Sequence, residues 1–394
     1  MVGVSTRMIV ESAVRAGNEV VAVDFFGDRD QVRLAETYAL GRDLGLRLTA
    51  ANLGVVARRI AAEAVMYGAN LENHPEVVDD LSRQGKLLGN DARSLSEVRD
   101  WAVLQRFSRS AGIAFPTTLL AGEEGQARRG GQWLRKRVRS GGGHGVRPWN
   151  GRRVDRAHVV QAWITGQPAS VAFVADGRTS RVIGIAEQLL GWRELGATGF
   201  TWCGNVVPLE LSAADYSHLV SQVSDMASQL TRRFRLRGLN GLDIVLRREA
   251  NGVLRPYLVE VNPRYTASLE LVERAYGVNA FALHLAAANG HLPPTSLAER
   301  PPGGFFAKGV LYAQETFTVG DTERWLAEGV RDVPFAGQSI AAGHPVCTVL
   351  ASGKDRSACL ADLAERASAV YANIGDMRKE RCGRTIHADN WAHA

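Results

Sequence analysis

Three oxygen-bearing side chains fall at matching positions of two neighbouring strands that we predict between residues 241 and 262. Apolar and polar residues alternate on both sides of Asn251-Gly252, a pair favoured in tight hairpin turns. If these two residues form the whole turn, Asp243 lies directly opposite Glu260, and Asn262 shares a face with Glu260. Facing carboxylates repel each other unless a divalent cation lies between them, and oxygen ligands suit Mg²⁺ with bridging phosphates rather than zinc. The pattern therefore predicts a magnesium site at this hairpin.

Other residues of the same hairpin leave this interpretation open. Asp243 and Glu260 need no metal if neighbouring arginines neutralise each of them. Pro256 cannot donate to a strand ladder, so it argues for an edge strand or for a bulge that would shift the register. Arg264 follows the second strand, at a place where a fixed guanidinium is able to hold a transferring phosphoryl group or a carboxylate.

A glycine-rich loop is the second candidate for chemistry. A short strand predicted over Trp133–Val138 runs into the sequence Ser140-Gly-Gly-Gly-His144. Consecutive glycines let backbone N–H groups turn toward a phosphate, and Lys136 adds a mobile positive charge. No Gly-Lys-Ser/Thr sequence closes the loop, so it is not a Walker A loop. The alternative is a flexible surface loop flanked by solvated arginines.

The composition sets the frame for these motifs. A chain of 394 residues with 45% apolar and 22% charged residues is expected to form two or three globular domains. No apolar run is long enough to span a membrane, and the first residues lack a signal-peptide pattern, so we expect a cytoplasmic protein. The net charge of +6 suits an anionic partner without choosing one, and only five of the 47 basic residues are lysine. Four scattered cysteines indicate neither disulfides nor zinc.

Helices and strands alternate along the chain. The segment Met8–Asp24 predicts a helix followed by a buried parallel strand, and a single Gly3 in place of G-x-G-x-x-G indicates a structural α/β domain rather than a dinucleotide site. The other expected helices and strands are helices over Ala50–Ala62, Ser96–Ala111 and Asp355–Ala372, and strands over Ala64–Gly68, Phe305–Tyr312 and Val346–Leu350.

Together these segments resemble the ATP-grasp superfamily, and more narrowly its predicted carboligases related to biotin carboxylase. The most specific motif is Leu258-Val-Glu-Val-Asn-Pro-Arg264 with an acidic strand upstream, and the stretch 338–349 fits the C-terminal unit of carboxylases. The resemblance implies an α/β protein in four parts. They are a Rossmann-like pre-ATP-grasp domain (1–93), a two-lobed ATP-grasp fold of α+β type with antiparallel sheets (94–300), a small β-rich C-terminal unit (301–375) and a tail (376–394).

The resemblance also implies cofactors and site residues. ATP and Mg²⁺ would bind, with Lys136 on the ATP phosphates, the glycines closed over them and the hinge strand 160–164 against adenine. Asp243, Glu260 and Asn262 would hold Mg²⁺, and Arg264 would steady the transferred phosphoryl group or an acyl phosphate. The remaining nucleotide contacts implied in this way are Gly141, Gly142, Gly143, Gln161, Trp163 and Ile164.

This sequence departs from the family pattern at two places. The hinge usually carries a glutamate, whereas Gln161-Ala162 stands here. A second ATP-contacting lysine is absent upstream, where Gln105, Arg106 and Arg109 stand instead. Both departures bear on how the chain would contact ATP.

The function expected from the resemblance is that of an ATP-dependent carboxylate–amine ligase. It would form an acyl phosphate, release ADP and phosphate, and act on a small carboxylic acid and an amine, a metabolite or cofactor precursor. Alternatives are carboxylation through carboxyphosphate, a non-catalytic nucleotide-binding protein, and nucleic-acid binding through arginine clusters such as Arg232–Arg237. We expect neither a nucleic-acid nor a membrane partner, and related carboxylases suggest a homodimer.

Overall fold

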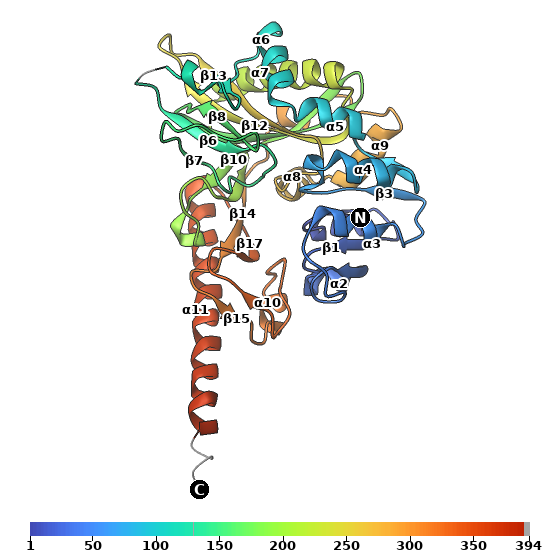
Figure 1. Cartoon of the computed structure of the whole chain (residues 1–394), viewed down its shortest axis with the longest axis vertical. Helices are drawn as coiled ribbons and strands as arrows, with labels where there is room; N and C mark the ends of the chain where they lie inside the picture. Colours follow the sequence, from blue (N-terminus) through green and yellow to red (C-terminus); the bar gives the residue numbers. More distant parts are fainter. Residues whose placement is uncertain (129, 390–394) are drawn as a thin grey trace.

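The computed structural model describes residues 1–128 and 130–389, and Figure 1 shows how its helices and strands are arranged. Three parts meet around the predicted site: an N-terminal unit (residues 1–89), a small four-stranded sheet (the small lobe, 118–162) and a large seven-stranded sheet. No helix among the described residues is long and apolar enough to cross a membrane. Cys203, Cys347 and Cys359 are buried free thiols.

The N-terminal unit is built on parallel strands. β1 pairs with β2, β3 pairs with β4, and Val2 bridges both Val23 and Tyr67, so one residue stands where a first strand would run. A parallel arrangement agrees with the α/β pattern of the sequence, while the name Rossmann-like stays a prediction. The elements are α1 (Arg7–Arg15), β1 (Val21–Asp24), α2 (Arg29–Val32), β2 (Glu36–Ala39), α3 (Ala50–Ala57), β3 (Ala64–Met66), η1 (Leu71–Asn73), α4 (Pro75–Ser82) and β4 (Lys86–Leu88).

Two helices connect this unit to the small lobe. The single helix predicted over Ser96–Ala111 is wrong, because α5 (Ala92–Val98) ends and α6 (Trp101–Ser110) begins within it. The Asp100 side chain accepts a hydrogen bond from the Val103 N–H and so caps α6.

The small lobe is an antiparallel sheet in the order β5-β8-β6-β7. Leu119, Trp133 and Val160 form a small core on one face of it, and the opposite face carries Lys136 and Gln161. The strands are β5 (Thr118–Leu119), β6 (Trp133–Arg137), β7 (Arg147–Pro148) and β8 (His158–Ala162).

The large sheet is antiparallel, in the order β13-β12-β9-β10-β11-β14-β17, and is buried on both faces. Along β9, Val171 and Phe173 pack into the core with α7, while Ala172 and Val174 pack into the core with α9. The strands are β9 (Gln167–Asp176), β10 (Ser180–Leu190), β11 (Trp202–Val207), β12 (Arg237–Arg248), β13 (Leu254–Asn262), β14 (Phe305–Tyr312) and β17 (Pro345–Gly353). The helices over it are α7 (Ala213–Phe234), α8 (Leu269–Tyr276) and α9 (Ala280–Ala288).

The β12–β13 hairpin has the predicted pairing for a different reason. Asp243 pairs with Glu260, as predicted, but the two-residue turn is wrong because residues 250–252 form the loop. The longer loop shifts the pairing of the residues between the loop and Ile244 by one position. A bulge between Asp243 and Ile244 then restores the predicted pairing at Asp243. The expected edge position of Pro256 is confirmed, since β13 is the outermost strand.

Two strands of the C-terminal residues extend the large sheet, and two others, β15 (Phe317–Thr318) and β16 (Ser339–Ile340), pair as a separate two-stranded sheet. β14 and β17 pair with each other and, through β11, with the rest of the sheet. The helix predicted to end at Ala372 runs further, because α11 (Arg356–Asp389) continues through the polar residues after 376 and projects away from the other elements (Figure 1). A short helix, α10 (Glu323–Ala327), lies between β15 and β16 in the sequence.

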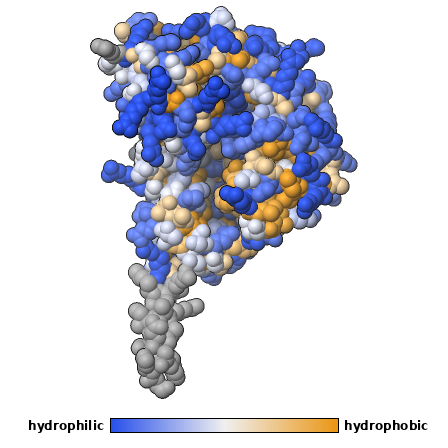
Figure 2. All heavy atoms as spheres, viewed as in Figure 1, coloured by the Kyte–Doolittle hydropathy of each residue, from blue (hydrophilic) through white to orange (hydrophobic). Residues whose placement is uncertain are grey.

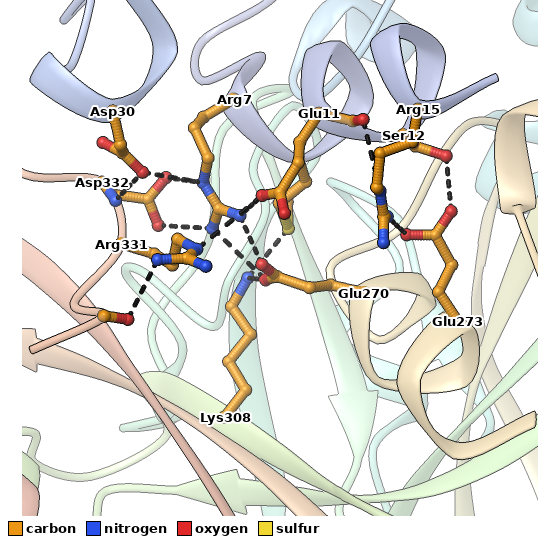
Figure 3. A network of polar contacts seen from close by, with 12 residues as sticks. Arg7, Glu11, Ser12, Arg15, Asp30, Glu270, Glu273, Lys308, Arg331 and Asp332 are labelled. Atoms are coloured by element: carbon orange, nitrogen blue, oxygen red, sulfur yellow. Dashed lines mark hydrogen bonds and ion pairs between the residues drawn. The ribbon is translucent and has the colours of Figure 1, made fainter. Parts of the chain in front are cut away.

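A buried network of charges joins the N-terminal unit to the C-terminal residues (Figure 3). Arg7 is fully buried, donates from Nε to Asp332 Oδ1 at 2.9 Å, and also binds Glu270 on α8. Lys308 of β14 donates to the same Glu270 at 2.7 Å. Burial raises the pKa of Glu270, but the charges of Arg7 and Lys308 outweigh it and hold the pKa below its ordinary value. One arginine therefore links segments more than 300 residues apart in the sequence.

Replacing this arginine is expected to destabilise the whole protein. Arg7→Ala leaves the buried Glu270 with Lys308 as its cationic partner. It also takes the arginine partner from the partly buried Asp332, and the two losses together are expected to cost about 3–5 kcal/mol of unfolding free energy. Chemical denaturation measures the loss, with Arg324→Ala as a matched control, because Arg324 is exposed and its pair with Glu328 contributes below about 1 kcal/mol. Equal stability of the two variants would contradict a central role for Arg7.

Candidate active site

The two predicted metal-binding carboxylates lie side by side at the edge of the large sheet. Asp243 Oδ1 accepts a hydrogen bond from Gln188 Nε2 at 2.8 Å, and its Oδ2 accepts one from Asn262 Nδ2 at 3.0 Å. Burial and the nearby negative charge of Glu260 raise the pKa of Asp243 to about 6. The structure thus brings Asp243, Glu260 and Asn262 together. Burial and the repulsion between the two carboxylates together disfavour the charged form of Asp243.

The alternative of neutralising arginines holds for one of the two carboxylates. Arg99, from the end of α5, forms an ion pair with Glu260 and also donates to the Val261 carbonyl at 3.1 Å. Asp243 instead has two neutral amide partners. Oxygen donors from Asp243, Glu260 and Asn262 fit a hard cation such as Mg²⁺, and such a charge would relieve the repulsion that raises the pKa of Asp243. Among the residues described, no group of three or more His, Cys, Asp or Glu side chains could hold a metal ion. A metal at this site would therefore need the Asn262 amide oxygen as well as the two carboxylates.

Lys136 faces these carboxylates from the small lobe. Its Nζ donates to Gln161 Oε1 at 2.6 Å, and Gln161 in turn donates to Thr118 Oγ1 at 3.0 Å. Burial lowers the pKa of Lys136, while the charges of Glu260 and Asp243 oppose that shift without cancelling it. Lys136 therefore lies within electrostatic range of both carboxylates, and a neutral amide holds it where the family usually has a glutamate.

The glycine loop closes onto the large sheet. The Gly142 carbonyl accepts a hydrogen bond from the Trp202 N–H at 2.9 Å, at the start of β11. Gly143 has a φ of +71°, and a Cβ atom there would lie only 1.8 Å from the Phe200 carbonyl oxygen. Gly141 has open space around it. Close approach of two backbones thus explains Gly143, which the sequence showed only as one glycine in a run.

The hinge residues after β8 lie at the border of the site. Trp163 is 41% exposed and packs edge-to-face on Phe200, with ring centroids 5.6 Å apart. It also borders a cavity of about 520 Å³ with Trp133 and Trp149. Trp133 lies on the face of β6 opposite to Lys136, so this cavity is separate from the carboxylate site. Ile164 is half-buried.

Arg264 lies just beyond β13 and is held from the N-terminal unit. Its Nε donates to Glu72 Oε1 at 2.8 Å, and Nη1 donates to the Tyr265 carbonyl at 3.0 Å. Nη2 lies 3.5 Å from Asn262 Oδ1, which connects the arginine to the carboxylate site.

Three neighbours of the site were missed in the sequence: Arg99, Glu72 and Asn73. They come from segments with no motif, so only their place in space reveals them. Gln105, Arg106 and Arg109 stand where the second lysine is missing, and no described contact joins any of them to the carboxylate site. Gln105 Nε2 donates to the Thr118 carbonyl, and Gln105 Oε1 accepts from the Thr118 N–H. Arg106 and Arg109 are exposed.

Comparisons with known proteins agree with this geometry. Residues 100–268 match the family described as ATP-grasp domain. This part of the chain is an ATP-grasp domain. An uncharacterized protein of Methanocaldococcus jannaschii is 25% identical over 156 residues, which are 40% of this chain and 35% of that protein.

Solved structures of carboxylases and a synthetase share the fold of most of the chain at low identity. Biotin carboxylase from Campylobacter jejuni, in a complex with β-γ-ATP, has a TM-score of 0.66 at 15% identity, over 91% of this chain and 88% of that one. N5-carboxyaminoimidazole ribonucleotide synthetase from Thermotoga maritima has a TM-score of 0.64 at 14% identity, over 93% and 96%.

The biotin carboxylase domain of Hydrogenobacter thermophilus 2-oxoglutarate carboxylase has a TM-score of 0.65 at 14% identity, over 88% and 83%. That structure is a dimer with MgADP, ADP and bicarbonate. The predicted ATP-grasp fold related to biotin carboxylase is therefore confirmed, and the predicted ATP and Mg²⁺ agree with what this relative in fold binds.

The lysine of the ATP-grasp domain gives a direct test of the nucleotide position. Lys136→Ala is expected to weaken MgATP binding about 10–100-fold, because a charged hydrogen bond contributes about 1.5–3 kcal/mol. Calorimetric titration measures the affinity, with Lys86→Ala as the control, since Lys86 is an exposed lysine of the N-terminal unit. Unchanged affinity in the Lys136 variant would place the phosphates elsewhere.

The glycine loop of the ATP-grasp domain allows a second, matched test. Gly143→Ala forces the loop away from Phe200, whereas Gly125→Ala, in the small lobe but outside the loop, meets no atom within 4 Å. We expect the first variant to bind MgATP at least about tenfold more weakly and the second to bind as wild type. Comparable affinities for the two variants would show that loop closure onto β11 does not contribute to binding.

Proposed function

We propose that this chain is an ATP-dependent carboxylate–amine ligase that works through an acyl phosphate. The observation that carries the proposal is the pairing of Asp243 with Glu260, beside Asn262, at the edge of an ATP-grasp sheet. Lys136 faces the pair from one side, and Arg264 contacts Asn262 from the other. This set of charges suits a phosphoryl transfer that depends on positioning and electrostatics rather than on a nucleophilic side chain.

Bound Mg²⁺ would supply charge neutralisation between the β- and γ-phosphates of ATP. Asp243, Glu260 and Asn262 are the residues proposed to hold it. Lys136 and the backbone of Gly141, Gly142 and Gly143 are proposed to bind the phosphates, and Gln161, Trp163 and Ile164 to border the base.

The proposed reaction has two steps. A carboxylate oxygen of the acid attacks the γ-phosphorus, and the bond from that phosphorus to the bridging oxygen breaks as ADP leaves. The amine nitrogen then attacks the acyl carbon, inorganic phosphate leaves with the bonding pair, and the nitrogen loses a proton. Arg264 holds negative oxygens in both steps, as a planar guanidinium is suited to do.

Carboxylation is the second candidate, and the shared fold favours it. The chain follows biotin carboxylases and N5-carboxyaminoimidazole ribonucleotide synthetase over about nine-tenths of its length. Bicarbonate would then take the place of the organic acid, and carboxyphosphate that of the acyl phosphate. Nucleic-acid binding has less support, because arginines such as Arg233 and Arg139 already pair with Glu97 and Glu76.

A homodimer also remains part of the proposal. Several large apolar side chains of the N-terminal unit are exposed, and Figure 2 shows apolar surface over this unit at the lower right. They are Phe26, Leu34, Leu44, Leu46 and Leu48. Contact with a second copy would remove this surface from water. A cytoplasmic location stays a prediction from the sequence.

The test of the proposed function is a product assay. MgATP is supplied with a panel of amino acids, small carboxylic acids, amines and bicarbonate, and ADP with phosphate is followed separately from AMP. ADP and phosphate that appear only with one acid and one amine establish the ligase. ADP formed with bicarbonate alone favours the carboxylase, and AMP contradicts both. Glu260→Gln, which loses a metal-binding charge, is expected to abolish turnover in either case while remaining folded.

A further inference from the structure

A three-residue turn of the N-terminal unit reaches two separate parts of the candidate active site. The turn is η1, and two of its neighbouring side chains, Glu72 and Asn73, are almost fully buried, at 2% and 4% exposure. We propose that this turn positions the catalytic groups, with Glu72 holding Arg264 and Asn73 holding Arg99 against Glu260. The inference rests on the proposed function, for which it names two further positioning residues.

Glu72 fixes the orientation of the arginine. Its Oε1 accepts from Arg264 Nε at 2.8 Å, while the Tyr265 carbonyl accepts from Nη1 at 3.0 Å. The guanidinium is a rigid planar fork, so two contacts on different nitrogens set its plane. Arg264 is 13% exposed, and Nη2 points to the Asn262 side. One edge of the fork is thus held in place while the other lies toward the proposed magnesium residues.

Asn73 performs the equivalent task for the carboxylate. Its Oδ1 accepts from both Nε and Nη2 of Arg99, at 3.1 and 2.7 Å. The remaining nitrogen, Nη1, pairs with Glu260. Asn73 therefore fixes the orientation of Arg99, and Arg99 in turn holds Glu260. Arg99 Nη2 also lies 3.5 Å from the carbonyl oxygen of Ser140, where the glycine loop begins.

Residues on either side of the turn in the sequence also bind the chain next to Arg264. The Tyr67 hydroxyl, at the end of β3, lies 2.9 Å from the carbonyl oxygen of Pro263, the residue before Arg264. Asn90 donates to the same carbonyl at 3.0 Å. The N-terminal unit and the β13 end are thus fixed to each other through the backbone as well as through Glu72.

The burial of Glu72 argues that its charge has a specific task, since a carboxylate at 2% exposure does not serve to contact water. Its Oε2 is buried and has no hydrogen-bond partner among the residues described. An incompletely paired buried carboxylate is costly, so a neutral residue would serve better if stability alone mattered. The charge of Arg264 is the compensation that the contacts show.

The experiment compares Glu72→Ala, Glu72→Gln and the control Asp80→Ala, which removes an exposed carboxylate paired with Arg58 elsewhere in the N-terminal unit. With the substrates that the product assay identifies, we expect Glu72→Ala to lower kcat about 100-fold, because misplacement by about 1 Å costs that much. The Kd for MgATP should change less than threefold. Glu72→Gln keeps an acceptor for Arg264 Nε, so its kcat should be at least about tenfold higher than that of Glu72→Ala. The control should match wild type.

Three outcomes would overturn the inference: a wild-type kcat in Glu72→Ala, a loss in MgATP affinity equal to the loss in kcat, or no recovery in Glu72→Gln. Thermal unfolding shows whether each variant is folded. If Glu72→Ala is unfolded, Glu72→Gln alone is compared with wild type.

A second readout does not depend on turnover. Phenylglyoxal modification followed by mass spectrometry reports how freely Arg264 reacts in the full-length chain. We expect faster modification in Glu72→Ala than in wild type and in Asp80→Ala, because the guanidinium loses its buried partner. An unchanged rate would overturn the positioning role. If the product assay finds no substrate, the proposed function fails while this measurement still decides whether Glu72 holds Arg264.

Discussion

The repulsion between Asp243 and Glu260 is the constraint around which the other polar groups are arranged. Strand pairing at the sheet edge places the two carboxylates opposite each other, and burial makes the second negative charge costly. Gln188 and Asn262 donate to Asp243, while Arg99 pairs with Glu260. These contacts keep the carboxylates in place without cancelling both charges, which leaves the site suited to a cation.

Each part of the chain contributes to this site. The large sheet holds the carboxylates, the small lobe brings Lys136 on β6, and the N-terminal unit brings Glu72 and Asn73. The glycine loop connects two of these parts, because the Gly142 carbonyl bonds the first residue of β11. The site therefore exists only when all three parts are packed together, and the buried network around Arg7 holds the N-terminal unit to α8, to β14 and to Asp332 (Figure 3).

The departures from the family pattern have a physical meaning in the structure. Gln161 occupies the place of the usual glutamate and holds Lys136 through a neutral amide rather than an ion pair. Gln105, at the place of the missing lysine, supports the backbone of β5. The positive charge proposed for the phosphates thus comes from Lys136 and Arg264, in a chain in which only five of the 47 basic residues are lysine.

The sequence alone was sufficient for what depends on local periodicity and turn chemistry. Alternation along residues 241–262 predicted the hairpin and its acidic pair, and the glycine run predicted the loop after β6. The match at Glu260 nevertheless depended on two features that alternation cannot show, a three-residue turn and a compensating bulge, whose shifts cancel. The Asp100 cap that divides one expected helix into two was equally hidden, because apolar spacing continues across it.

Only the tertiary structure decided which groups act on the carboxylates and on Arg264. Arg99 lies 161 residues from Glu260 in the sequence, and Glu72 lies 192 residues from Arg264. A side chain's own segment carries no sign of such a partner, because the partner is chosen by how sheets and helices pack. Composition and spacing determine which elements form and which face each residue takes, whereas ion pairs across units depend on the distances set when those faces meet.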